Sequence, residues 1–371
     1  MQVTYFDNNA TTKVAPQVLA KMNEVYQMPL NNSAVHHFGR FASKFIEDAR
    51  KEVRKLLNAQ NYEVIFNSSA TEATNTLFRG CDAKKILVSQ IEHASAYSCR
   101  PDGKEVSEIK VLSNGVIDLE DLKLHLEKIS DPNFLVSVMF ANNETGALQP
   151  VEEISKLVHQ KGGLFHCDIV QGVGKIPLDL EKINADFASI SAHKINGPQG
   201  VGALLMRKGL DVKPLIVGGK QEKSKRAGTM NTAGIAGFGE ACKVATTKIP
   251  EYENVQKLRD LMESEIKKIS GDNLIIFCAD TPRLPNTCFM ALKNCDSQTQ
   301  LINFDINGIC VSAGSACSSG TVAESRVLKA MGIDSAFSTS AIRVSLAPEN
   351  TKEEVEKFIK VWSEFYERTK K

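Results

Sequence analysis

The sequence predicts an α/β fold in which a large domain with a mostly parallel sheet between helices is joined to a smaller α+β domain. Three observations lead to this prediction. Apolar, β-branched runs alternate with helical patterns up to about residue 250, several of these runs are apolar on both faces, and the pattern changes afterwards. A strand that is apolar on both faces fits a parallel sheet covered by helices on both sides.

Six strand-like runs are expected in the large domain. They are Glu63–Phe66, Lys85–Val88, Leu135–Phe140, Gly163–Cys167, Phe187–Ile190 and Gly202–Met206. Apolar residues at three- and four-residue spacing predict helices near residues 41–57 and 119–129. Strands that alternate with helices on this scale are typical of βαβ units.

The small domain is expected to begin with a long charged helix over Tyr252–Ile269. Strands are predicted at Leu274–Phe277, Thr287–Leu292 and Ile342–Ser345, and Thr351–Glu354 is a capping box that starts the last helix. The predicted division is a large domain over 14–250 and a small domain formed by 1–13 and 251–371.

Composition excludes several classes of protein. With 45 Lys and Arg against 44 Asp and Glu, the formal net charge of the 371 residues is +1, so no footprint for nucleic acid is expected. No apolar run approaches the ~20 residues that span a bilayer, and the N-terminus lacks a secretory signal. The nine cysteines, odd in number and without a CxxC pair, indicate reduced thiols in a cytoplasmic protein.

Two residues at expected strand ends suggest a cofactor site. Lys194 follows the run Phe187–Ile190, and Asp168 follows Gly163–Cys167. Such sheets bind ligands at the carboxyl ends of their strands. An amine there can form a Schiff base with an aldehyde cofactor, and an acid can keep a pyridine nitrogen protonated. Alone, Lys194 would be interpreted as a surface lysine and Asp168 as a helix cap or ion-pair partner.

Small residues after the run Glu63–Phe66 predict a phosphate site. Ala70 and Thr71 begin a helical pattern, and the free N–H groups at a helix start bind phosphate. An N-capped helix without a ligand explains the same residues. His93 follows the next strand, where it either contacts a cofactor ring or is a structural histidine.

Two further candidates lie near the C-terminus. Cys317 stands among small, flexible, polar residues, a setting that suits an exposed thiol better than a core one. Arg343 lies inside the strand-like run Ile342–Ser345. A buried arginine needs an anion, which is either a substrate carboxylate or a structural ion-pair partner.

Together these segments resemble the cysteine desulfurases of the NifS/IscS type, within the class V, fold-type I pyridoxal-phosphate enzymes. The resemblance covers nearly the whole chain, and the order and spacing of its motifs are more specific than any one of them. The matching segments are Tyr5–Thr12, His36–Arg40, Ala70–Glu72, Glu92–His93, Asn142–Gly146, Asp168–Gln171, Ser191–Lys194, Arg226–Thr229, Gly314–Ser318 and Ile342–Leu346.

The resemblance implies a role for each matching residue. Lys194 corresponds to the Schiff-base lysine, His93 to the residue stacked on the ring, and Cys317 to the nucleophile that forms a persulfide. Asn143 and Arg343 correspond to groups that hold the amino-acid carboxylate. The full set of implied cofactor contacts is Ala70, Thr71, His93, Asn143, Asp168, Gln171, Ser191, His193, Lys194 and, from a second protomer, Thr229.

The implied activity is removal of sulfur from L-cysteine with pyridoxal 5'-phosphate, which yields L-alanine and a persulfide on Cys317. A homodimer and an iron–sulfur scaffold protein as sulfur acceptor are also implied. No intrinsic metal site is expected, although Cys317 could transiently ligate an iron–sulfur cluster. A class V aminotransferase, a selenocysteine lyase and a non-enzymatic sulfur or iron–sulfur carrier stay open as alternatives.

Two departures from the family pattern lie near the implied site. Ser69 replaces a usual glycine before Ala-Thr-Glu, and Leu30–Ala34 replaces the usual Gly-Asn-Pro-Ser-Ser. Neither removes a catalytic group.

Overall fold

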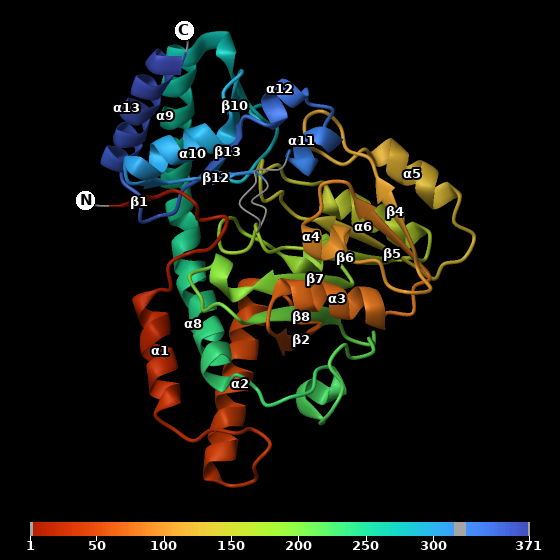
Figure 1. Ribbon diagram of the computed structural model, residues 1–371. Helices are drawn as coiled ribbons and strands as arrows, with labels where there is room; N and C mark the ends of the chain where they lie inside the picture. The colour runs from red at the N-terminus through yellow and green to blue at the C-terminus, as the bar shows by residue number, and fades with distance from the viewer. Residues whose placement is uncertain (1–2, 315–323, 370–371) are drawn as a thin grey trace.

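Seven strands form the central sheet of the computed structural model, which describes residues 3–314 and 324–369. Their spatial order is β2-β8-β7-β6-β5-β3-β4 (Figure 1). Neighbours pair in parallel, except that β8 is antiparallel to both β2 and β7. The strands are β2 Tyr62–Asn67, β3 Lys85–Ser89, β4 Glu105–Ile109, β5 Phe134–Met139, β6 Leu164–Asp168, β7 Phe187–Ser191 and β8 Gly202–Arg207. The mostly parallel sheet is confirmed, and β4 is the one strand of this sheet that was not expected.

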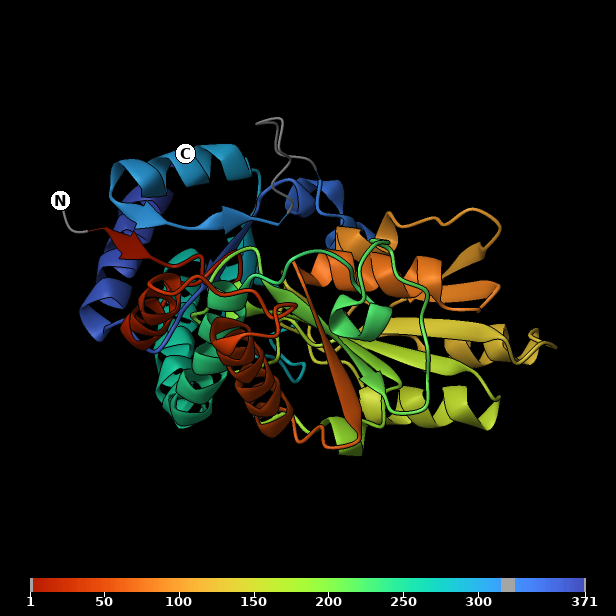
Figure 2. The same cartoon turned by 90° about the horizontal axis from the view of Figure 1, so that it is seen from below.

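Helices cover both faces of this sheet because successive side chains of a strand point to opposite sides. Helix α3 (Ala70–Gly80) packs with α4 (Ala94–Tyr97) on one face. The other face carries α2 (His37–Leu56), α6 (Val151–Gln160) and α8 (Thr232–Lys248). Figure 2 shows α3 and α6 on opposite sides of the strands.

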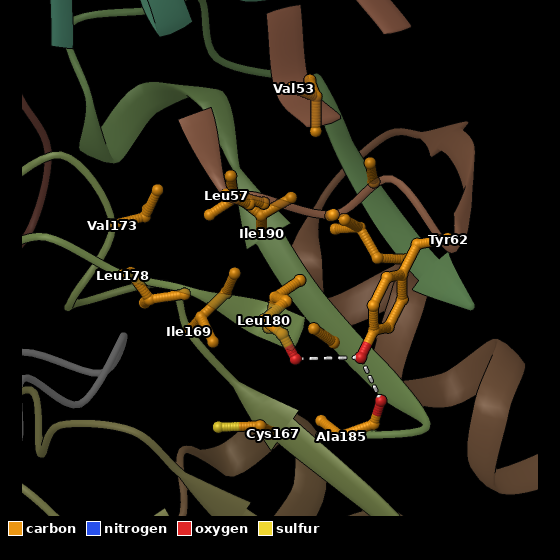
Figure 3. Close-up of a cluster of buried hydrophobic side chains, with 14 of the residues drawn as sticks. Val53, Leu57, Tyr62, Cys167, Ile169, Val173, Leu178, Leu180, Ala185 and Ile190 are labelled. Atoms are coloured by element: carbon orange, nitrogen blue, oxygen red, sulfur yellow. Dashed lines mark hydrogen bonds between the residues drawn. The ribbon is translucent and has the colours of Figure 1, made fainter. Parts of the chain in front are cut away.

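Tyr62 is packed in the apolar core between the sheet and helices α2, α6 and α8 (Figure 3). The ring is fully buried among apolar side chains, and its hydroxyl donates to the backbone carbonyls of Leu180 and Ala185 at 3.1 and 2.5 Å. These two hydrogen bonds connect β2 to the short helix α7 (Leu180–Ile183) and the residues after it, in the crossover between β6 and β7. The crossover is what places the ends of β6 and β7 side by side.

Helix α8 was not predicted. Its residues are buried on nearly every side, so it lacks the apolar stripe by which an amphipathic helix is recognised. Small residues let it approach its neighbour closely: a Cβ at Gly239 would lie 2.6 Å from the Cα of Ala49 on α2. Close packing of α1 (Pro16–Tyr26), α2 and α8 follows from this (Figure 1).

A second sheet has the order β12-β13-β10-β9 and is packed against α9 and α13. The elements of this part are α9 Tyr252–Ser270, β9 Leu274–Ile276, β10 Thr287–Leu292, α10 Ser297–Ile306, β12 Ser312–Ala313, α11 Arg326–Ala330, α12 Ser335–Ser338, β13 Ala341–Ser345 and α13 Lys352–Thr369. The N-terminal strand β1 (Thr4–Tyr5) joins this part by pairing with β11 (Ile309–Cys310). The remaining helix, α5 (Leu119–Glu127), lies in the large part.

The predicted capping box of the last helix is present. Thr351 Oγ1 accepts the backbone N–H of Glu354 at 3.3 Å, and Glu354 Oε2 accepts that of Thr351 at 3.1 Å. The two groups of elements have separate apolar cores, which supports a division near residue 250, while the boundaries given above stay predictions.

The described residues include eight free cysteines, of which seven are buried and Cys310 is half-buried. Within the same residues, no helix is long and apolar enough to cross a bilayer.

Candidate active site

A cavity of about 520 Å³ opens at the carboxyl ends of β6 and β7, where sheets of this kind bind ligands. Its walls come from both groups of elements, including the start of α3, the turn before α4 and the strands β12 and β13. Ten of the residues expected from the sequence line it: Ala70, Thr71, His93, Asn143, Asp168, Gln171, Ser191, His193, Lys194 and Arg343.

Lys194 ends the 3₁₀ turn Ala192–Lys194 that follows β7. Its Nζ donates to the backbone carbonyls of Asn9 at 2.6 Å and Ala10 at 2.7 Å. Burial, reinforced by the positive charge of Arg343, lowers the pKa of Lys194 to about 8. Much more of this amine is therefore neutral near pH 7 than in an exposed lysine, and the neutral amine is the nucleophilic form.

Asp168 is the last residue of β6, which pairs in parallel with β7. Its Oδ1 accepts the backbone N–H of Val170 at 3.0 Å. Burial raises the pKa of Asp168, and the hydrogen bond from Val170 and the nearby charge of Lys194 oppose that rise. A cationic group placed against this carboxylate would be stabilised, because little water screens the interaction.

His93 is the N-cap residue of α4 and is exposed to the cavity. Its Nδ1 accepts the backbone N–H of Ser95 at 3.1 Å and lies 2.9 Å from the Ser95 hydroxyl. Partial burial lowers the pKa of His93. The neutral ring that this favours carries its proton on Nε2, since Nδ1 is an acceptor.

The start of α3 has the form of an anion site. Ser69 caps the helix by accepting the N–H of Glu72 at 3.1 Å. No partner for the backbone N–H groups of Ala70 and Thr71 is found in the described part of the chain. Ser69, the departure from the family pattern, thus serves as the cap and leaves two N–H groups facing the cavity.

Gly202 on β8 allows the backbone just before α3 to lie close against the sheet. A Cβ at Gly202 would lie 2.8 Å from the carbonyl carbon of Ser69, so the backbone before α3 can approach β8 only at a glycine. His193 also lines the cavity, and burial lowers its pKa to about 4. Its neutral ring, with Nδ1 3.1 Å from the Thr11 hydroxyl, can donate to an anion from Nε2.

Arg343 of β13 is buried and already has an anion beside it. Its Nη2 donates to Asp7 Oδ1 at 2.7 Å, and its Nη1 donates to the carbonyl of Asn143 at 3.1 Å. The Nε atom is buried without a partner among the described residues. The sequence left a choice between a structural ion pair and a substrate contact, and the structure contains the ion pair at the edge of the cavity.

One expected residue does not line this cavity, and another lies outside the described residues. Thr229 is exposed and does not contribute to the cavity of its own chain. Cys317 lies outside the described residues. Gly314 and Arg326, the nearest described cavity-lining residues before and after it, both face the cavity.

Comparison with known proteins decides the family. The family model described as aminotransferase class-V matches residues 4–358. The chain belongs to the class-V aminotransferase family. Among its relatives is a cysteine desulfurase of Nostoc sp., which is 38% identical over 385 aligned positions that cover 99% of this chain and 94% of the relative.

Other members of the class-V aminotransferase family show the same similarity. A cysteine desulfurase IscS of Dictyoglomus turgidum is 37% identical, and the match covers 95% of this chain and 91% of that protein. The solved structure of a NifS-like protein from Rickettsia africae superimposes with a TM-score of 0.92 at 38% identity, over 99% of this chain and 100% of that one. The fold expected from the resemblance is therefore confirmed.

This class-V family member also has cavity residues to which the sequence analysis gave no role. The backbone carbonyl of Asn9 accepts from both Lys194 and Gln171 Nε2, the latter at 3.0 Å. Glu92 and Glu144 are buried carboxyls, and burial raises their pKa values to about 8 and about 7. All three stand in segments that resemble the family, yet only the folded chain shows what they contact.

Proposed function

We propose that this protein is a pyridoxal-phosphate-dependent cysteine desulfurase that converts L-cysteine to L-alanine and keeps the sulfur as a persulfide on Cys317. The observation that carries the proposal is the placement of Lys194, Asp168 and the open N–H groups of α3 around one cavity. An amine, an acid and an anion site are what an aldehyde, a pyridine nitrogen and a phosphate require.

The direct test is incubation with L-cysteine, with and without a reductant, while alanine and sulfide are measured. Alanine should form in both samples, and sulfide should be released chiefly with the reductant, which cleaves the persulfide. If no alanine forms with a protein that has bound pyridoxal phosphate, the desulfurase proposal is wrong.

The residues of the cavity fit pyridoxal phosphate group by group. Ala70, Thr71, Ser191 and His193 would hold the phosphate, Asp168 the pyridine nitrogen, Gln171 the phenolic oxygen, and His93 the ring face. When bound, the cofactor supplies an electron sink for bonds at the substrate Cα and Cβ. Two free N–H groups and a buried carboxylate with one hydrogen bond are the observations that support this fit.

The substrate would be oriented by the small-domain side of the cavity. Arg343 and Asn143 would hold its carboxylate, with Asp7 fixing the guanidinium in place. Lys194 would take and return the proton at Cα, because its lowered pKa makes the amine a usable base near neutral pH. His93 could share this transfer through Nε2.

Sulfur transfer is assigned to Cys317. Its thiolate attacks the sulfur of the substrate, the new S–S bond forms as the C–S bond breaks, and the electron pair leaves with the carbon. Protonation of that carbon gives the methyl group of alanine. This is nucleophilic catalysis, in which one difficult step is divided into two easier ones.

The pKa of Lys194 predicts how cofactor capture depends on pH. An amine adds to an aldehyde only when neutral, and with the lowered pKa of about 8 the neutral fraction rises about tenfold per pH unit below pH 8, reaches about half at pH 8 and levels off above about pH 9. Absorbance after mixing apo-protein with pyridoxal phosphate measures this rate. A rate that keeps rising in proportion to hydroxide up to pH 10 would show that the Lys194 pKa is not lowered.

The alternatives differ in what they need from these residues. A class V aminotransferase needs Lys194 and Asp168 but no thiol nucleophile, and a sulfur carrier needs Cys317 but neither of the other two. Borohydride treatment of the loaded protein followed by peptide mapping separates them, since a carrier should have no cofactor fixed to Lys194. Selenocysteine and cysteine are distinguished by comparing kcat/KM for the two substrates.

We further propose a homodimer in which Thr229 contacts the phosphate of the other protomer, and an iron–sulfur scaffold protein as the sulfur acceptor. Thr229 is exposed and does not line its own cavity, and the chain also has strongly exposed apolar side chains, among them Val217 (82%) and Val35 (91%). Sedimentation of a fully active monomer would contradict the dimer.

A further inference from the structure

A completely buried lysine lies beneath the cavity, and none of the described acidic residues pairs with it. Lys175 is 1% exposed, and its Nζ donates to Gln171 Oε1 at 2.8 Å and to Asn9 Oδ1 at 2.9 Å. Both acceptors are neutral amide oxygens. Lysine is almost never fully buried without an ion-pair partner, so this position carries a cost in stability that needs a function to explain it.

The two hydrogen bonds fix which way the Gln171 amide faces. Its oxygen accepts from Lys175, and its nitrogen donates to the backbone carbonyl of Asn9 at 3.0 Å. If the amide were turned over, its oxygen would face the Asn9 carbonyl, which is a repulsive contact, and the N–H that Lys175 donates would lose its acceptor. Gln171 lines the cavity and therefore offers an N–H there, not an oxygen.

The Asn9 side chain is held in the same manner. Its Oδ1 accepts from Lys175 and from Asn286 Nδ2 at 3.0 Å, and its Nδ2 donates to the Thr287 hydroxyl at 2.9 Å. The backbone carbonyl of Asn9 is consequently fixed where it accepts from Lys194. Lys175 thus contacts both residues that orient the polar groups on this side of the cavity.

We propose that Lys175 is a positioning residue, whose amine orients the amides of Gln171 and Asn9 so that Gln171 presents an N–H to the phenolic oxygen of the cofactor. This inference rests on the proposed function. The two acceptors match the two N–H groups of a neutral amine, whereas a protonated amine has three. Burial, with the charges of Lys194 and Arg343, lowers the pKa of Lys175 and favours that neutral form.

The test is Lys175→Met, which keeps an unbranched side chain and removes the donors. Wild-type and variant apo-proteins are loaded with pyridoxal phosphate, and the visible absorption band is titrated with pH. An N–H at the phenolic oxygen stabilises its ionised form, so losing it should raise the midpoint by roughly half to one pH unit, the equivalent of about one hydrogen bond. An unchanged midpoint would overturn the inference.

A double-mutant cycle separates positioning from a purely structural role. Gln171→Ala should raise the midpoint like Lys175→Met, and the double variant should raise it no further than Gln171→Ala alone, since Lys175 acts through Gln171. Additive shifts would show that Lys175 acts otherwise. Lys243→Met is the matched control, because Lys243 is exposed on α8 and pairs with Glu240, which is not part of this network.

Gln171→Glu keeps the inference testable if Lys175→Met fails to fold. The new carboxylate would form an ion pair with Lys175, which offsets the loss of the N–H donated to the Asn9 carbonyl, so the apo-protein should unfold within a few degrees of wild type. If Lys175 did not donate to residue 171, a buried carboxylate would be left unpaired and the unfolding temperature should fall sharply. Wild-type protein that gains no visible band with pyridoxal phosphate would instead refute the proposed function, and this inference with it.

Discussion

Lys194→Ala should abolish the covalent fixation of pyridoxal phosphate by borohydride and nearly all alanine release, while the fold survives. Loss of the amine removes both the group that attaches the cofactor and the base at Cα, and proton transfer by a positioned base alone is worth about 10²–10⁴-fold in rate. Mass spectrometry of the reduced protein and an alanine assay measure the two effects.

The expected effect on stability is small, because the partners of Lys194 keep other contacts. The Asn9 carbonyl retains the N–H of Gln171, and the exposed Ala10 can be solvated. We expect the free energy of unfolding of the apo-protein to fall by about 1 kcal/mol. Lys182→Ala, at an exposed lysine paired with Glu152, is the control that should retain activity. Insoluble Lys194→Ala protein would favour a structural role for this lysine.

Cys317→Ala should bind pyridoxal phosphate and L-cysteine normally but release alanine about 10³-fold more slowly or worse, as expected when an enzyme loses its nucleophile. Cofactor binding needs only the described residues that line the cavity, so the visible spectrum should still change when L-cysteine is added. This prediction rests on the family resemblance and on Gly314 and Arg326, the nearest described residues that line the cavity on either side of Cys317 in the chain.

Cys310→Ala is the matched control for the thiol. Cys310 is half-buried, and burial raises its pKa, so its thiolate fraction near pH 7 is small. The control should release alanine like wild type. Wild-type protein treated with L-cysteine should gain one reductant-sensitive sulfur on Cys317 alone. Normal alanine release by Cys317→Ala, or extra sulfur found only on another cysteine, would remove the persulfide mechanism and favour a plain aminotransferase or lyase.

Much of the fold could be predicted because its signals are local. The buried strands are continuous apolar runs, and the capping box of the last helix is a four-residue pattern whose two hydrogen bonds are both formed. Helix α8 and strand β4 could not be predicted in this way. Helix α8 is buried on nearly all sides and therefore has no apolar stripe. Strand β4 (Glu105–Ile109) is an edge strand with few buried residues.

The cavity residues also fall into two groups, those that local sequence signals predict and those that they do not. Lys194, Asp168 and the start of α3 were found because each follows a predicted strand, and parallel strands bring their carboxyl ends to one edge. Asp7, Asn9 and Lys175 were not assigned roles, because their contacts join segments that are far apart in the chain. No periodicity or spacing reports such contacts.

The sequence by itself determined the layered α/β architecture, the family resemblance and the strand ends that carry Lys194 and Asp168, since these follow from short-range patterns of apolar and polar residues. Only the tertiary structure determined the pKa values and the hydrogen-bond partners of those groups. Burial lowers the pKa of Lys194 and raises that of Asp168, Asp7 pairs with Arg343, and the amine of Lys175 donates to the side-chain oxygens of Gln171 and Asn9. The physical reason is that desolvation and hydrogen-bond partners depend on what surrounds a side chain in space, which neighbours in sequence do not specify.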